Sequence, residues 1–176
     1  MDDPYFITNI SAKVDIAPNL LVSQNIYHII KNRAKELYEK KCNPYGYIDI
    51  IYKIVDYKDG HIVSENFDGN VIFNITYTAK ICYPKINSVI EARITNINKV
   101  IILAENGPIT VTIAKQNINK SNFKLNPDGS LVIKDTDEIV TVNHKIKVKV
   151  IASDFHNFDN NIFIYGYLEN ILNDIK

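Results

Sequence analysis

The sequence predicts an α+β fold, in which one helix lies on an antiparallel sheet and an OB-type β-barrel follows it. Three observations support this prediction. A single long segment, from Leu20 to about Glu39, has helical periodicity, whereas most other segments alternate as strands do. After Tyr83-Pro84-Lys85 the helical signal disappears, and short strands separated by turns follow. We therefore expect two domains, residues 1–84 and 85–176.

The composition favours a folded chain without a strong charge bias. Of the 176 residues, 46% are hydrophobic, and 20 basic side chains balance 20 acidic ones. This balance excludes a polybasic protein that binds nucleic acid by bulk electrostatics, so any such contact must come from a local patch. The abundance of Ile, Asn, Lys and Tyr, which share A/T-rich codons, indicates a biased genome.

No segment is predicted to cross a membrane or to direct secretion. The longest aliphatic run, Val100–Ala104, is far shorter than the ~20 residues that a spanning helix needs. The start of the chain is acidic and precedes no long apolar stretch, unlike a signal peptide. Cys42 and Cys82 are too few for a disulfide framework, so we expect free thiols and an intracellular protein.

The first domain is predicted to begin with a strand and a helix. Residues Ile7–Ile16 alternate loosely, and Pro18 with Asn19 interrupts this strand. From Leu20 to about Glu39 the apolar residues fall on one helical stripe, and Asn19 is a plausible N-cap.

Three antiparallel strands are expected to complete the first domain. Tyr47–Tyr57 is rich in Ile, Val and Tyr, and Lys58-Asp59-Gly60 is a hairpin signal because Asp-Gly favours a positive φ. His61–Ser64 would be the short return strand. Val71–Cys82 alternates well, with its apolar side chains on one face.

The second domain is expected to contain five main strands. Turn residues at 106–108 and 126–130 separate these strands, and a longer irregular connection lies in the middle of the domain. This arrangement suits a small Greek-key barrel of the OB type. The strands are expected at Val89–Ile97, Val100–Ala104, Ile109–Ile113, Lys145–Ala152 and Asn161–Leu168, with a further short one at Leu131–Ile133.

No catalytic, metal-binding or cofactor-binding motif is found, so we do not expect an enzyme. The four histidines are scattered, and no His-x-x-x-His or Cys-x-x-Cys pair occurs. Six glycines cannot supply a phosphate-binding loop as well as the turns. The acidic residues Asp135, Asp137 and Glu138 are interpreted as a solvated loop because they lack the further oxygen ligands of a cation site.

A basic strand is the main candidate for a binding surface. Residues 145–150 alternate lysine with aliphatic residues, which places the lysines on one face. Such a face suits single-stranded nucleic acid, but lysines on an exposed strand also prevent edge pairing, and the sequence favours neither interpretation. The candidate RNA-binding residues are Arg93, Lys99, Lys115, Lys145, Lys147 and Lys149.

Motifs spread over nearly the whole chain together resemble a known family. Each is weak alone, but their order and spacing are more specific. In chain order they are Asp15-Ile16-Ala17-Pro18, Glu39-Lys40-Lys41-Cys42, Tyr45-Gly46-Tyr47-Ile48, Asp59-Gly60-His61-Ile62, Val71–Tyr77, Tyr83-Pro84, Val89–Ile97, Asn106–Val111, Asp128-Gly129-Ser130, Val148–Ile151 and Gly166-Tyr167-Leu168.

These motifs resemble the stalk subunit of DNA-dependent RNA polymerase, which is the seventh subunit of eukaryotic polymerase II and has an archaeal equivalent. The resemblance implies a non-catalytic subunit that docks on the largest polymerase subunits near the mobile clamp, binds a small helical partner and places its barrel near the RNA exit path. It implies docking through tip loops of the first domain, for which the candidates are Pro18, Asn19, Pro44, Tyr45, Gly46, Tyr47, Glu65, Asn66 and Gly69.

The chain departs from this family in its second barrel strand. Family members carry a glycine and aromatic residues there, whereas residues 98–103 lack both and Thr112 follows where an aromatic is common. We therefore expect any binding of nascent RNA to depend mainly on charge. Sequence divergence and codon bias suggest a large DNA virus, with the protein in a viral factory or virion, or in the nucleus if the source is cellular. The alternative is a free-standing OB-type RNA-binding or translation-type factor.

Overall fold

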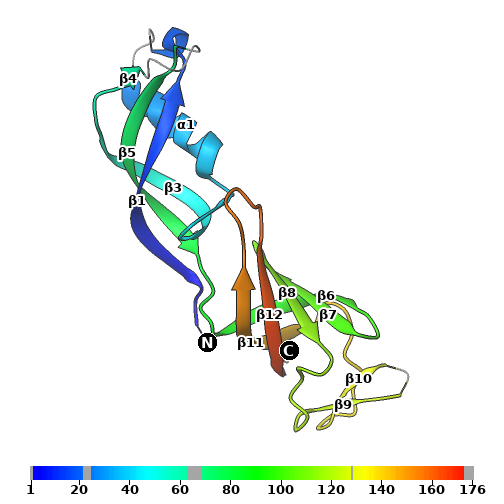
Figure 1. Cartoon of the computed structure of the whole chain (residues 1–176). Helices are drawn as coiled ribbons and strands as arrows, with labels where there is room; N and C mark the ends of the chain where they lie inside the picture. The colour runs from blue at the N-terminus through cyan, green and yellow to red at the C-terminus, as the bar shows by residue number, and fades with distance from the viewer. Residues whose placement is uncertain (1, 22–24, 63–68, 128, 173–176) are drawn as a thin grey trace. The chain divides into compact units, whose positions relative to one another are not determined.

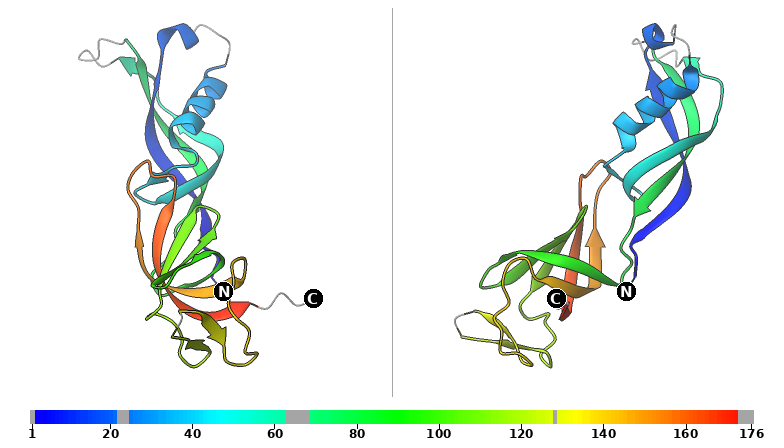
Figure 2. Two further views of the ribbon diagram at one scale, coloured as in Figure 1. Left: turned by 90° about the vertical axis from the view of Figure 1, so that its right-hand side faces the viewer. Right: turned by 180° about the vertical axis from the view of Figure 1, so that it is seen from behind.

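The computed structural model describes residues 2–21, 25–62, 69–127 and 129–172. The chain forms two compact units (Figures 1 and 2). One contains Tyr5–Cys82, and the other combines residues up to Pro4 with the chain from Tyr83 onward. The described residues are mostly β-structure, with a single α-helix among them.

The Tyr5–Cys82 unit is a five-stranded antiparallel sheet with a helix on one face (Figure 2). Its central strand, β5, pairs with β1 on one side and with β3 on the other, and β2 extends the sheet beyond β3. The short strand β4 also pairs with β5. The elements are β1 (Tyr5–Ile16), the 3₁₀ turn η1 (Pro18–Leu20), α1 (Ile26–Tyr38), β2 (Cys42–Asn43), β3 (Gly46–Tyr57), β4 (His61–Ile62) and β5 (Val71–Cys82).

The hydrophobic core of this unit lies between α1 and the sheet. The helix contributes Ile30 and Ala34, which are fully buried. Alternate residues of β5 from Phe73 to Ile81 are buried beneath them, as the sequence alternation predicted. The Tyr38 ring stacks on Tyr77 at 6.0 Å between centroids, so an aromatic pair closes one end of the helix–sheet contact.

The helix begins later than predicted. Asn25, not Asn19, is the N-cap, and its side-chain oxygen accepts from the Tyr27 backbone N–H at 3.2 Å. Asn19 lies instead in η1, where Leu20 N–H donates to the Ala17 carbonyl at 3.0 Å. The fixed φ of Pro18 suits the first position of such a tight turn, so the proline starts a separate turn rather than the long helix.

The hairpin predicted at Lys58-Asp59-Gly60 is wrong. Strand β4 pairs with β5 and not with β3, so the chain continues along β5 after this segment instead of reversing. Gly60 does not have the positive φ expected of a primed turn. It is required for space, because a Cβ atom there would lie 2.7 Å from the Phe73 ring and would also meet Val71. Ser64, the predicted end of the return strand, lies outside the described residues.

The second unit contains a closed five-stranded barrel in the order β11-β12-β8-β7-β6. Neighbouring strands are antiparallel except β12 and β8, which are parallel. This topology is compatible with an OB fold. The strands are β6 (Val89–Ile97), β7 (Ile101–Asn106), β8 (Ile109–Ala114), β11 (Lys145–Asp154) and β12 (Ile162–Leu172), with a separate two-stranded ribbon of β9 (Phe123–Leu125) and β10 (Leu131–Ile133).

Aliphatic side chains fill the barrel, and alternate residues of each main strand point inward. On β12, Gly166 takes an inward position. A Cβ atom there would meet Val148 and would lie 3.2 Å from Val111, so the glycine allows close packing at this level of the barrel. The N-terminal residues belong to this unit because Asp2 N–H donates to the Val89 carbonyl at 3.0 Å.

Within the described residues, no helix is long and apolar enough to cross a membrane. Cys42 and Cys82 are buried and are not joined by a disulfide. They lie on either side of Tyr47, which pairs with Cys42 in β2 and with Cys82 in β5.

Candidate docking cleft and nucleic-acid interface

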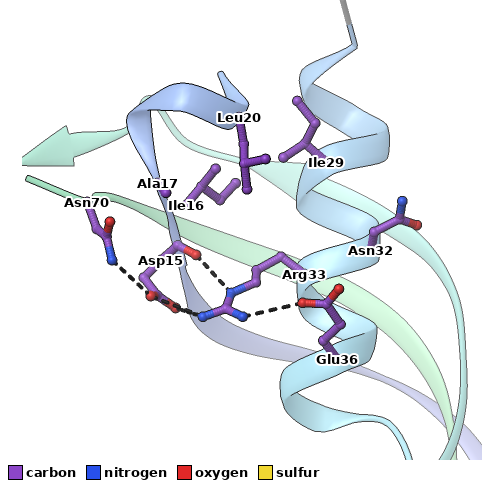
Figure 3. Close-up of a pocket in the computed structure, with 9 residues that line it drawn as sticks. All are labelled: Asp15, Ile16, Ala17, Leu20, Ile29, Asn32, Arg33, Glu36 and Asn70. Atoms are coloured by element: carbon purple, nitrogen blue, oxygen red, sulfur yellow. Dashed lines mark hydrogen bonds and ion pairs between the residues drawn. The ribbon is translucent and has the colours of Figure 1, made fainter. Parts of the chain in front are cut away.

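A cleft of about 410 Å³ opens between α1 and the end of β1 (Figure 3). It lies where β1 leaves the sheet and turns into η1, so residues from the strand, the turn and the helix meet there. We call it the loop-end cleft. The lining residues are Asp15, Ile16, Ala17, Leu20, Ile29, Asn32, Arg33, Glu36 and Asn70.

A network around Arg33 forms the polar side of the loop-end cleft. The guanidinium Nη2 lies 3.0 and 3.2 Å from the two carboxylate oxygens of Asp15, and Nε donates to the Asp15 carbonyl at 3.0 Å. Nη1 donates to Glu36 at 3.3 Å, and the Asn70 amide donates to Asp15 at 3.3 Å. The hydrogen bond with Asp15 is the main reason that the pKa of Arg33 is raised above its usual range.

The other side of the cleft is apolar. Leu20 projects from η1 with half of its surface exposed, and Ile29 faces it from the helix (Figure 3). Ile16 forms the floor and is buried. An apolar wall beside two carboxylates and one guanidinium suits a polypeptide partner, because it offers both burial and polar recognition.

The structure divides the predicted docking residues between two ends of the sheet. Pro18 and Asn19 are exposed on η1, which follows the end of the sheet where Ile16 pairs with Val71. Gly69, which has a φ of 66°, lies close to Val71 in the sequence. The segment Pro44–Tyr47 lies at the other end, where Tyr47 pairs with Cys82. Glu65 and Asn66 lie outside the described residues.

Within the Pro44–Tyr47 segment, the residues differ in exposure. Tyr45 is 62% exposed and its N–H donates to the Asn43 side chain at 2.8 Å, whereas Tyr47 is buried. Gly46 has a φ of 126°, a conformation that favours glycine, so its role is in the backbone.

The predicted basic residues also fall into two groups. Lys145, Lys147 and Lys149 lie on the outward face of β11, since the intervening residues Ile146 and Val148 are fully buried. Arg93 on β6 pairs with Lys145 and is exposed.

Lys99 and Lys115 belong elsewhere on the barrel. Both line a hollow beside Gly129, and the Lys115 amine donates to the Gly129 carbonyl. Because Lys115 is only 9% exposed, its side chain holds this loop to the barrel.

Sequence reasoning did not place the aromatic residues of β12. Phe163, Tyr165 and Tyr167 alternate with four buried residues, so the three rings lie on the outward face of β12. Of the three, Tyr167 pairs with a lysine of β11, Lys149. The alternation from Ile162 to Leu168 was visible in the sequence, but the neighbour of Tyr167 depends on the register in which β11 pairs with β12.

The described residues contain no group of three or more His, Cys, Asp and Glu side chains that could hold a metal ion. The fold and surfaces define a two-unit protein, with a helix-and-sheet unit that bears a cleft and a closed OB-compatible barrel that bears lysines and aromatic rings.

Comparison with known proteins gives the family. The chain is 30% identical over 147 residues to a protein of Acanthamoeba polyphaga mimivirus that is named, provisionally, as a DNA-directed RNA polymerase subunit. The match covers 84% of this chain and 73% of the viral protein. The chain therefore belongs to the family of this DNA-directed RNA polymerase subunit. No family model matches it.

Proposed function

We propose that the protein is a non-catalytic stalk subunit of a multisubunit DNA-dependent RNA polymerase. The observation that carries this proposal is the 147-residue match to the viral polymerase subunit. A match of that length extends over parts of both units, because neither unit is that long. The resemblance of the sequence motifs to the stalk subunit supports the more specific role within the polymerase, that of the stalk.

The Tyr5–Cys82 unit is the part that docks on the polymerase core in this proposal. Its loop-end cleft combines the exposed Leu20 with the Arg33 network, and the predicted docking residues Pro18 and Asn19 lie on the adjoining turn. By the family resemblance, the surface reached would be the base of the clamp on the largest subunits. A small helical partner would bind the same chain.

The barrel unit would lie near the RNA exit path, where its outward lysines could contact nascent RNA. The closed five-stranded barrel supports this role, since OB barrels commonly bind single strands. A protein with this role would be found with the polymerase. If the polymerase is viral, that location is a viral factory or the virion.

Copurification tests the proposal. The tagged full-length protein is expressed in its native host system and captured, and the bound proteins are identified by mass spectrometry. We expect the two largest polymerase subunits to remain bound in salt that strips loosely bound RNA-binding proteins. Capture of RNA and ribosomal proteins without polymerase subunits would contradict the proposal and favour a free-standing RNA-binding factor.

A further inference from the structure

We propose that a hollow on the barrel unit binds an acidic, aliphatic-rich segment of a protein partner. The hollow has a volume of about 390 Å³ and is lined by residues 97–99, 115, 129–131 and 140–142. We call it the ribbon hollow, because residues 129–131 lead into β10 of the β9–β10 ribbon (Figure 1). The inference goes beyond the proposed function, since it assigns a protein ligand to the barrel unit and does not depend on the polymerase.

Backbone hydrogen bonds hold the segments around the ribbon hollow together. Lys115 N–H, just after β8, donates to the Val100 carbonyl in the turn between β6 and β7 at 3.0 Å. Val140 N–H donates to the carbonyl of Leu131, the first residue of β10, at 2.8 Å. Two of the walls are therefore fixed to neighbouring strands, and the hollow is a built feature of the fold.

A buried cation lies at the ribbon hollow without a counterion. Lys115 is only 9% exposed, and its amine donates to the Gly129 carbonyl, which is neutral. A lysine ammonium has three donors, so the carbonyl leaves others for a ligand. Among the described parts of the chain, no carboxylate forms an ion pair with Lys115. Because buried charges in proteins are normally paired, an anionic ligand would stabilise this one.

A second lysine lies on the same side of the hollow. A Cβ atom added to Gly129 would lie 3.6 Å from the Lys115 amine nitrogen and 3.7 Å from the Cα atom of Lys99. Both lysines therefore adjoin Gly129, and Lys99 is exposed. Two cations at one position attract a carboxylate more strongly than either does alone.

The described acidic residues of the adjoining segment lie beyond the hollow. The Glu138 carbonyl accepts from Ile133 N–H at 2.9 Å, which places Glu138 further along β10 than Leu131. Asp135 and Asp137 lie between these two residues in the chain, and none of the three acids lines the hollow. Asp128 lies outside the described residues. The described charges that line the hollow are thus both positive.

The rest of the lining is mainly aliphatic. Leu131 and Val140 are buried, whereas Val142 is 47% exposed, and Val100 in the adjoining turn is 72% exposed. No aromatic ring is among the described lining residues, so bases of RNA would have nothing to stack on. Exposed aliphatic side chains beside cations instead complement a polypeptide that carries both leucine-like and acidic side chains.

The ligand is therefore a segment in which an Asp or Glu side chain has an aliphatic neighbour. Its carboxylate would accept from Lys115 and Lys99, and its aliphatic side chain would cover Val142. This assignment gives a protein ligand to the two lysines that the sequence grouped with the candidate RNA-binding residues.

A titration followed by nuclear magnetic resonance tests the inference. The full-length protein, labelled with nitrogen-15, is titrated with a capped peptide of sequence Glu-Leu-Glu-Glu-Leu-Glu. We expect the largest amide shifts at Lys99, Gly129 and Val142, and an affinity that falls as salt is added. The matched peptide Gln-Leu-Gln-Gln-Leu-Gln has no carboxylate side chains and should bind at least five-fold more weakly.

Variants separate the charge from the aliphatic contact. Lys99→Glu should weaken binding of the acidic peptide about five-fold or more, and Val142→Asn about three-fold. Lys115→Met removes the buried charge and should also weaken binding. Circular dichroism melting checks that it is folded, and Lys99→Glu, at an exposed position, tests the charge if it is not. Lys85→Glu, an equal charge change at an exposed lysine of the same unit outside the hollow, should bind as the wild type does.

The inference is overturned if the wild type does not bind the acidic peptide at low salt, or binds both peptides equally. It is also overturned if Lys99→Glu binds with wild-type affinity, or if an oligouridylate shifts the same amides and the acidic peptide does not. A rise in affinity for Asp128→Asn as large as the fall for Lys99→Glu would show that the chain supplies its own anion, and the hollow would then not be a ligand site.

Discussion

Both carboxylate oxygens of Asp15 lie within 3.2 Å of one guanidinium nitrogen of Arg33, and the same guanidinium also holds the backbone carbonyl of Asp15. The contact joins the last turn but one of α1 to the end of β1, across 18 residues of chain. It therefore fixes the helix over the sheet at the margin of the loop-end cleft.

Replacing Arg33 should destabilise the Tyr5–Cys82 unit modestly. Both side chains are more than a third exposed, so solvent screening limits the loss for Arg33→Leu to about 1 kcal/mol. Because the pKa of Arg33 is raised, its charge persists through neutral and alkaline pH, and the loss should not shrink there. Urea denaturation measures the change. Lys31→Leu on the same helix is the control, and equal losses in both variants would contradict a specific role for the pair.

Gly60→Ala should destabilise the fold through a steric clash. The added methyl would meet Val71 and lie within 2.8 Å of two Phe73 ring atoms, and overpacking of this kind costs about 1–3 kcal/mol. Thermal melting measures the loss. The double variant Gly60→Ala/Val71→Ala removes one clashing group, so it should lose less than the sum of the two single variants. Additive losses would indicate that the clash is not the cause.

The protein should lose stability in alkaline solution, in part through Tyr77. Burial raises the pKa of Tyr77 above its usual value of 10.0, so the folded state keeps the proton while the unfolded state releases it. The resulting stabilisation is complete below pH about 10 and declines as the pH rises beyond that value.

Denaturation near neutral pH and at pH about 11 tests the role of Tyr77. The variant Tyr77→Phe should lose less stability between the two pH values than the wild type does. Tyr45→Phe, which alters an exposed tyrosine, should behave as the wild type. If Tyr77→Phe and the wild type decline in parallel, burial of Tyr77 is not a source of the alkaline loss.

Docking on the polymerase should depend on the loop-end cleft. Leu20→Glu places a charge on the apolar wall and should weaken capture of the polymerase about ten-fold, the size of effect typical of a central interface residue. Tyr45→Glu, which changes another exposed apolar side chain at the other end of the sheet, is the control and should retain capture. The opposite result would move the docking surface to the Pro44–Tyr47 segment.

Alternation in the sequence predicted the long strands, because it reports directly which side chains a sheet buries. The bounds of β5 and β6 agree with those predicted from their apolar periods. Local signals were less reliable where the packing of distant strands overrides them. The Asp-Gly pair predicted a tight hairpin, but β3 and β4 both pair with β5 and not with each other. Glycine is necessary at position 60 because a Cβ atom there would clash with the Phe73 ring.

The contacts between surface residues of different strands could not be predicted in this way. Lys115 and Lys149 look equivalent in the sequence, yet Lys115 is buried and donates to the Gly129 carbonyl, whereas Lys149 lies on the outer face beside Tyr167. Likewise, no local pattern joins Asp15 to Arg33 or Thr112 to Tyr165. These neighbours arise from sheet pairing and barrel closure between segments far apart in the chain, and periodicity within one segment carries no information about its partner.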